Sequence, residues 1–289
     1  MDQRIINLYD HFTHGGISRR TFLDKLTQIA GSAAAAAALL PLLQNDYAKA
    51  AIVAPADDRL LPERTAFDSP KGKIDGYLTR LKAKGKRPAV LVIHENRGLN
   101  PHLEDVARRF ALEGFLVYAV DLLSLVGGTP PSEDDARALH GKLNQDDAVA
   151  ALVSAVGFLK SHPESTGKVG AVGFCFGGLM VNRLAASSPE LDAGVAYYGR
   201  QVPAAQVPAI KAALMLHYAE NDEGVNAGIA NYEAALKANN KSYIIHNYPG
   251  AQHAFNNDTG GARYDKTAAD LAWTRTTDFF KEKLGAPPR

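Results

Sequence analysis

The sequence predicts an α/β fold, a doubly wound, mostly parallel sheet with helices on both faces. Short apolar runs that do not alternate suit strands buried on both faces, and they lie at 89–93, 115–120, 169–174, 194–198, 213–216 and 242–248. Segments with helical spacing lie between them, at 101–112, 145–160, 176–187, 226–238 and 264–284. Strand and helix in alternation give such a sheet. Residues 63–68 and 74–81 alternate as a leading antiparallel pair.

Composition describes an ordinary globular protein. The chain has 289 residues, of which 46% are hydrophobic and 22% are charged, and its net charge is +1. Such a balance implies neither nucleic-acid binding nor attraction to an anionic membrane. The single cysteine excludes an intramolecular disulfide, and no Cys/His cluster has the spacing of zinc ligands. We therefore expect no metal and no cofactor.

Residues 1–50 have the features of a bacterial export signal. Ser-Arg-Arg-Thr-Phe-Leu at 18–23 is a twin-arginine pattern, an apolar run follows at 29–43, and Ala48-Lys49-Ala50 is a small-x-small cleavage site. The apolar run is shorter than the roughly 20 residues of a membrane span, so we expect no stable membrane insertion after cleavage. The alternative is an Ala-rich amphipathic helix that packs on the domain.

The signal interpretation has consequences for the organisation of the chain. We expect cleavage after about Ala50, recognition by the twin-arginine export machinery, and a periplasmic or secreted location. Residues 51–289 then form one catalytic domain, without internal repeats or a low-complexity linker.

The only cysteine lies in a strand-turn-helix pattern. Gly173, Cys175 and Gly177 form Gly-x-Cys-x-Gly, which is the nucleophile elbow with cysteine in place of serine. In that turn the nucleophile has a strained backbone, and glycines allow the strand and the helix to approach closely. The alternative is that Cys175 is a small buried apolar residue.

A base and an acid follow Cys175 in the chain order of an α/β-hydrolase. Ligands bind beyond the carboxyl ends of parallel strands, and His253 lies in a Gly-rich loop after the last apolar run. For the acid we prefer Asp222 to Glu220 and Glu223, although a turn-capping role is the alternative for Asp222. An imidazole can take the thiol proton, and the acid orients that imidazole.

The other histidines are weaker candidates. His217 and His246 lie within apolar strands and are expected to be satisfied core or ladder residues. The remaining five lie in the signal, on helix faces or in turns, where we expect solvent exposure: His11, His14, His102, His140 and His162.

A third group of polar residues follows the strand at 89–93. The backbone N–H of Asn96 and that of Phe176 are the expected oxyanion-hole donors. Glu95, at a buried strand end, needs a partner, and either the Cys175 thiol or the Arg97 guanidinium could serve. The alternative is a Glu95–Arg97 surface pair of little consequence.

These motifs resemble the dienelactone hydrolase family (carboxymethylenebutenolidases) of the α/β-hydrolase superfamily. The resemblance spans about 54–284, with Gly-Phe-Cys-Phe-Gly-Gly at 173–178, His94-Glu95, Asp222 and Gln252-His253-Ala254-Phe255 in the matching places. It implies a Cys175–His253–Asp222 triad, with Glu95 holding the resting thiol and then helping to ionise it. It also implies hydrolysis of an enol lactone through a thioester.

One departure concerns the substrate. The family pattern includes arginines for a substrate carboxylate after the strand that ends near Asp121 and shortly after the catalytic histidine, and neither segment has one here. Arg97 and Arg200 could substitute, or the substrate is a neutral ester or lactone. Two other functions stay open: the same triad acting on another acyl or phosphotriester substrate, and a non-catalytic exported binding protein.

Overall fold

The α/β fold predicted from the sequence is confirmed by the computed structural model, which describes residues 1–47 and 51–287. Eight strands form one sheet in the order β1-β2-β4-β3-β5-β6-β7-β8. The antiparallel pair is β1 (Leu60–Ser69) and β2 (Gly72–Leu81), and β2 also runs antiparallel to β4 (Leu116–Val120). All pairs from β4 to β8 are parallel.

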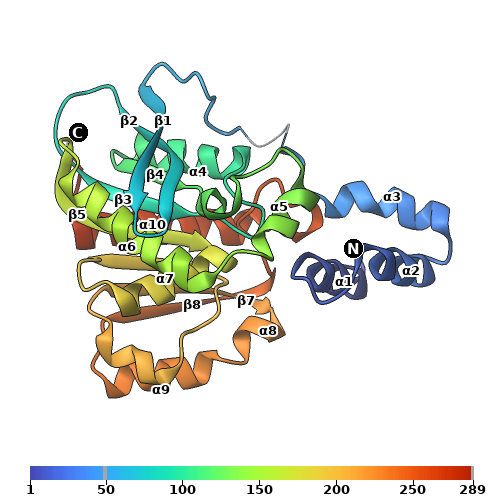
Figure 1. Ribbon diagram of the computed structural model, residues 1–289. Helices are drawn as coiled ribbons and strands as arrows, with labels where there is room; N and C mark the ends of the chain where they lie inside the picture. Colours follow the sequence, from blue (N-terminus) through green and yellow to red (C-terminus); the bar gives the residue numbers. More distant parts are fainter. Residues whose placement is uncertain (48–50, 288–289) are drawn as a thin grey trace.

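The remaining elements follow the predicted alternation closely (Figure 1). The other strands are β3 (Arg87–Ile93), β5 (Ser165–Phe174), β6 (Ala193–Tyr197), β7 (Ala213–Asn221) and β8 (Tyr243–Gln252). The helices between and after them are α4 (Pro101–Leu112), α6 (Gln145–Ser161), α7 (Phe176–Ser187), α9 (Ile229–Ala238) and α10 (Lys266–Leu284).

Two apolar cores lie on opposite faces of the sheet. Along β3, Leu91 and Ile93 belong to the core under α6, α7 and α9, whereas Val90 and Val92 belong to the core under α4 and α10. This alternation explains why the parallel strands read as continuous apolar runs, since both faces are covered. At about 25 cal/mol per Å² of apolar surface removed from water, such burial is the main stabilising contribution.

Some elements were not predicted. Helices α5 (Glu133–His140) and α8 (Glu223–Asn226) and the 3₁₀ turn η2 (Leu122–Val126) lie in segments expected to be loops. Strand β7 also runs five residues beyond the expected end at Leu216, because it pairs with β8 as far as Asn221 opposite Gln252. The segment that holds Glu220, Asp222 and Glu223 therefore begins inside a strand.

The N-terminal segment, residues 3–43, forms three further helices beside the α/β body: α1 (Gln3–Thr13), α2 (Arg19–Ala30) and α3 (Ala33–Leu43) (Figure 1). Ser18 and Ser32 cap α2 and α3 by accepting from backbone N–H groups. The helices enclose a third apolar cluster, separate from the two cores of the body, which comprises Ile5, Tyr9, Phe22, Leu26, Ala36 and Leu43.

The predicted export signal covers these three helices. No single helix in the described residues has the length and apolar character of a membrane span; α2 and α3 meet those criteria only as a pair, and they are bent by 112° at their junction. The predicted cleavage motif, residues 48–50, lies outside the described residues. Export and cleavage stay predictions.

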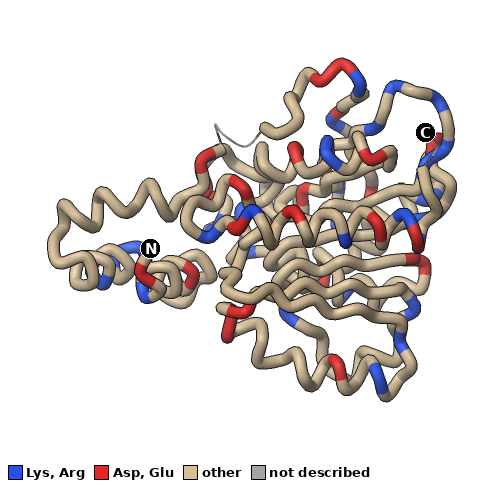
Figure 2. Tube along the Cα trace, turned by 180° about the vertical axis from the view of Figure 1, so that it is seen from behind, with Lys and Arg blue, Asp and Glu red and all other residues tan. Residues whose placement is uncertain are grey.

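Charge is distributed as the composition predicts. Figure 2 shows basic and acidic residues interspersed along the body, whereas α3 carries no charge at all.

Candidate active site

Cys175 lies in a sharp turn between β5 and α7. Its φ of 55° is in the left-handed region, which a side chain rarely adopts, and its N–H donates to Tyr197 O at 3.0 Å. A Cβ on Gly177 would lie 2.3 Å from Ile93 O, so only glycine permits this approach of helix to sheet. The strained backbone and the tight packing together present the sulfur at the carboxyl end of the sheet.

His253 and Asp222 form a buried acid–imidazole pair. His253 Nδ1 lies 2.6 Å from Asp222 Oδ2, and the residues are 6% and 7% exposed. Asp222 also caps α8 by accepting from the Val225 N–H, so the capping interpretation and the acid interpretation describe one side chain. A carboxylate on Nδ1 fixes the ring orientation and directs Nε2 away from itself.

Two imidazoles face the sulfur of Cys175. His14 Nε2 lies 3.1 Å from Cys175 Sγ. Donor atoms of His14, Cys175 and His253 all lie within 4.8 Å of one another, and the His14 and His253 rings meet edge to face at 4.7 Å. His253 Nε2 is buried and has no hydrogen-bond partner in the described part of the chain.

This arrangement changes the acidity of each group. Burial would raise the pKa of the Cys175 thiol, but the facing His14 and His253 imidazoles lower it to about 6. Burial would lower the pKa of His253, but the Cys175 thiolate and the carboxylates of Asp10 and Asp222 raise it well above its usual range. The site therefore favours a thiolate beside imidazolium over two neutral groups.

Glu95 and Arg97 are both buried, at 3% and 4% exposure, rather than paired at the surface. Glu95 Oε2 accepts from Asn257 Nδ2 at 3.2 Å, and Arg97 Nε lies 3.2 Å from Glu133 Oε2. Among the described residues, the hydrogen-bond partner of the Cys175 sulfur is His14 and not Glu95.

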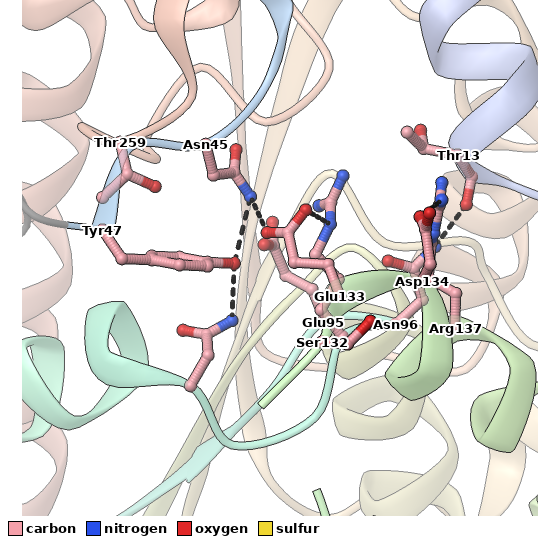
Figure 3. A network of polar contacts seen from close by, with 12 residues as sticks. Thr13, Asn45, Tyr47, Glu95, Asn96, Ser132, Glu133, Asp134, Arg137 and Thr259 are labelled. Carbon is pink, nitrogen blue, oxygen red and sulfur yellow. Dashed lines mark hydrogen bonds and ion pairs between the residues drawn. The ribbon is translucent and has the colours of Figure 1, made fainter. Parts of the chain in front are cut away.

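The expected oxyanion donors lie next to the sulfur and next to the N-terminal segment. Phe176 is the first residue of α7, so its N–H has no intrahelical acceptor. The side chain of Asn96 donates to Thr13 O at 2.7 Å, which ties the end of α1 to the loop after β3 (Figure 3).

A large cavity opens over the sulfur. Its volume is 1220 Å³, and both the body and the N-terminal segment line it. Of the arginines expected to bind substrate, Arg200 lines this cavity and Arg97 is not among the described lining residues. The other sequence-predicted site residues in the wall are Asn96, Cys175, Phe176, Asp222 and His253.

The other histidines divide into correct and wrong predictions. His217 is a satisfied core residue as predicted, with Tyr248 OH at 2.8 Å from Nδ1 and Thr276 Oγ1 at 3.1 Å from Nε2. The expected exposure of His102 is wrong, because the residue is only 2% exposed. Its Nδ1 lies 3.0 Å from Asp258 Oδ1, since this face of α4 packs against the loop between β8 and α10.

His14 and Asp10 are the site residues that the sequence analysis missed. His14 is exposed, as the sequence predicts, but its imidazole also contacts Cys175, which the export-signal interpretation does not predict. A sequence signal was present, since two titratable residues four apart lie on one face of a helix. Nothing in the sequence itself directs that face toward a residue 161 positions away.

The chain is similar to known proteins over most of its length. The dienelactone hydrolase family model matches residues 74–284, and a family model described as YqhI-like matches residues 1–31. "Protein usf" of Aquifex pyrophilus is 35% identical over 228 residues, which cover 75% of this chain and 97% of that protein.

Solved structures share the fold. A dienelactone hydrolase from Anabaena variabilis aligns with a TM-score of 0.60 and 25% identity, over 78% of this chain and 99% of that one. A dienelactone hydrolase-like promiscuous phosphotriesterase from metagenomic libraries aligns with a TM-score of 0.68 and 24% identity, over 78% and 100% of the two chains. This chain belongs to the dienelactone hydrolase family and is a hydrolase of esters or lactones with the α/β-hydrolase fold.

Proposed function

We propose that the protein hydrolyses lactones or activated carboxylic esters through a Cys175–His253–Asp222 triad and a thioester intermediate. The observation that carries this proposal is the buried His253–Asp222 pair beside a cysteine held at a strained elbow. A binding protein would need neither the strained backbone nor the oriented imidazole.

Acylation starts from the thiolate. Sulfur attacks the carbonyl carbon and the carbonyl oxygen becomes an oxyanion, for which the N–H groups of Phe176 and Asn96 are the proposed donors. Collapse of this intermediate breaks the carbon–oxygen bond of the ester or lactone. The leaving oxygen takes the proton of the His253 imidazolium, and an acyl group remains on Cys175.

Deacylation restores the site. Neutral His253 removes a proton from water, and the hydroxide formed attacks the thioester carbonyl. The carbon–sulfur bond breaks, the carboxylic acid product leaves, and sulfur returns as thiolate beside imidazolium. Asp222 holds the ring in place through both steps and stabilises its charged form.

Arg200 is the proposed contact for a substrate carboxylate, because it is exposed in the cavity wall while Arg97 is engaged with Glu133. Arg200→Ala should raise KM for carboxylated lactones and leave the kinetics of neutral lactones unchanged, since only the former have a group to pair with guanidinium. Equal effects on both substrates would assign the enzyme to neutral esters or lactones.

Removal of the sulfur tests the proposal directly. Cys175→Ala should lower hydrolysis of p-nitrophenyl acetate by about 10³-fold or more, because Cys175 is the only cysteine in the sequence and the substitution removes the proposed nucleophile. Burst kinetics under excess substrate should show acyl-enzyme formation in the wild type only. Equal rates for the two proteins would overturn the proposal, because the sulfur would then have no part in the hydrolysis.

A phosphotriester substrate is the second candidate for the same triad. A dialkyl aryl phosphate assayed beside a neutral lactone decides between them by kcat/KM. Stronger hydrolysis of the phosphate, lost in Cys175→Ala, would replace the lactone assignment while keeping the sulfur as nucleophile.

Export by the twin-arginine machinery stays a prediction about residues 1–50. Mass measurement of the N-terminus of protein isolated from its native host tests it. A chain that begins near Ala51 supports a periplasmic or secreted enzyme, whereas an intact Met1 supports a chain that keeps its N-terminal helices.

A further inference from the structure

His14 approaches Cys175 from the opposite end of the chain to His253. It is the residue that ends α1, and its Nε2 is 3.1 Å from the sulfur. This distance between nitrogen and sulfur is within the range of a hydrogen bond. An element outside the catalytic domain thus provides the nearest polar contact of the nucleophile.

The other ring nitrogen of His14 is held by Asp10. Nδ1 lies 2.8 Å from Asp10 O and 3.3 Å from Asp10 Oδ1, one helical turn earlier. Nδ1 therefore carries the donated proton, and Nε2 is left to accept from a thiol or to donate to a thiolate. The Asp10–His14 pair therefore resembles the Asp222–His253 pair, because in each an acidic residue holds Nδ1 of the imidazole.

Several contacts hold α1 in this position. Asn96 donates to Thr13 O beside His14, and the side chains of Gln3 and Gln252 exchange hydrogen bonds of 2.7 and 2.8 Å (Figure 3 shows the Thr13 contact). Farther along, Asn45 donates to Glu133 Oε1 at 3.0 Å. Residues 3–45 are therefore tied to the body at three places.

We propose that His14 is a catalytic residue that keeps Cys175 ionised in the resting enzyme. The thiol S–H bond breaks, the proton passes to Nε2 of His14, and the electron pair stays on sulfur. His253, whose proton then comes from solvent rather than from the thiol, is protonated at rest; it donates that proton to the leaving group and, once neutral, takes one from water. The inference rests on the proposed use of Cys175 as nucleophile.

Charges around His14 and Cys175 agree with this assignment. Burial would lower the pKa of His14, but the Cys175 thiolate and the Asp10 carboxylate outweigh it and raise the pKa to about 10. Asp10 has its own pKa lowered, by His253, His14 and Arg263 against the opposing effect of burial. The titratable and charged groups that interact with His14, with Cys175 or with their immediate partners are Asp10, Glu95, His140, Tyr198, Asp222, His253 and Arg263.

His14 thus occupies the place at the thiol that the family resemblance implies for Glu95. The Glu95 carboxylate is bonded to Asn257 instead. A carboxylate that accepts a hydrogen bond from the S–H group favours the neutral thiol, whereas an imidazolium favours the thiolate. The two arrangements therefore predict opposite resting states, which a titration of the thiol distinguishes.

The test is the pH dependence of Cys175 alkylation by iodoacetamide in the full chain, with an intact Met1 verified by mass and with EDTA present to remove trace metals. Cys175 is the only cysteine, so the signal has one source. The wild-type rate should be half-maximal near pH 6, since the thiolate is lost as pH falls through the folded pKa. His14→Gln should raise that midpoint by about 1–2 units and lower the rate at pH 6 by about tenfold.

His11→Gln is the matched control, because His11 is a histidine of the same helix and makes no hydrogen bond to Cys175 in the described residues. It should leave the midpoint unchanged. Ultraviolet titration of the thiolate, with Cys175→Ala as blank, gives the same midpoint without an alkylating reagent. An unchanged midpoint in His14→Gln, or a native mature chain that starts at Ala51, would overturn the inference.

The alkylation and titration of the thiol need no substrate, so the proposed function and the proposed role of His14 can fail separately. If Cys175→Ala keeps full hydrolytic activity, the proposed function fails while the thiol titration still reports on His14. If His14→Gln keeps the wild-type midpoint but Cys175→Ala is inactive, the triad stands and His14 has no part in ionising the sulfur.

Discussion

Two acid–imidazole pairs meet at one sulfur, and they come from regions of very different construction. The Asp222–His253 pair follows two neighbouring parallel strands, and both residues are almost fully buried. The Asp10–His14 pair lies on a helix outside the sheet, and its side chains are 30% and 35% exposed. The first is fixed by the body, whereas the second depends on the docking of a separate small cluster.

This difference suggests a division of labour. A proton that must move in each step of the reaction needs a rigid, desolvated base, because misplacement of that base is costly. A group that only biases the resting ionisation of the thiol can tolerate a looser position, since Coulomb attraction falls off slowly with distance. The four predictions below test that division.

Loss of the two imidazoles should have unequal effects. His253→Ala should lower kcat/KM for p-nitrophenyl acetate by about 10³-fold or more, because both proton transfers lose their base. His14→Ala should lower it by less than about tenfold at neutral pH and have little effect well above the thiol pKa. Similar losses from both variants at alkaline pH would show that His14 also transfers protons during turnover.

The two carboxylates should differ in the same sense. Asp222→Asn should lower kcat by about 10²- to 10⁴-fold, because an amide at Nδ1 favours the wrong tautomer of the ring. Asp10→Asn should lower the rate only a few-fold, since the Asp10 carbonyl still holds His14 Nδ1. Steady-state kinetics of both variants across pH give the comparison. A larger loss in Asp10→Asn would reverse the assignment of the two pairs.

The body and its triad positions could be predicted because local patterns carry them. Apolar runs of four to seven residues identify the buried strands, and glycines at 173 and 177 identify the elbow. The positions of Asp222 and His253 then follow from the rule that parallel strands end at one edge. The longer β7 could not be predicted, because its last residues are polar and owe their extended form to pairing with β8.

The second pair could not be predicted, because it depends on a contact between distant segments. The pattern around Arg19 and Arg20 favours an export signal, so it predicts that His14 belongs to a targeting segment rather than to an active site. The predicted exposure of His102 is wrong for a related reason, since its partner Asp258 lies 156 positions later. Sequence spacing locates neighbours within an element, but it does not show which surface another element covers.

Stability should separate the two regions as well. Leu26 is fully buried in the N-terminal cluster and Leu91 is fully buried in the body. Leu26→Ala should cost about 2–5 kcal/mol within that cluster, so residues 3–43 should exchange amide hydrogens faster while the Tm of the body stays unchanged. Leu91→Ala should lower the Tm of the body. A fall in Tm of the body in both variants would show one cooperative unit.

The smallest predicted effect concerns the contact that joins the regions. Asn96→Ala removes the hydrogen bond to Thr13 O but keeps the backbone N–H that is the proposed oxyanion donor. One such bond contributes about 1 kcal/mol, so protection of α1 from limited proteolysis should fall about fivefold, with kcat/KM changed by less than about threefold. Asn96→Asp keeps the size of the side chain but removes the Nδ2 donor, so it tests the same hydrogen bond in a second way. If turnover fell with protection in both variants, docking of α1 would be required for the chemistry itself, and the looser role given to the Asp10–His14 pair would be wrong.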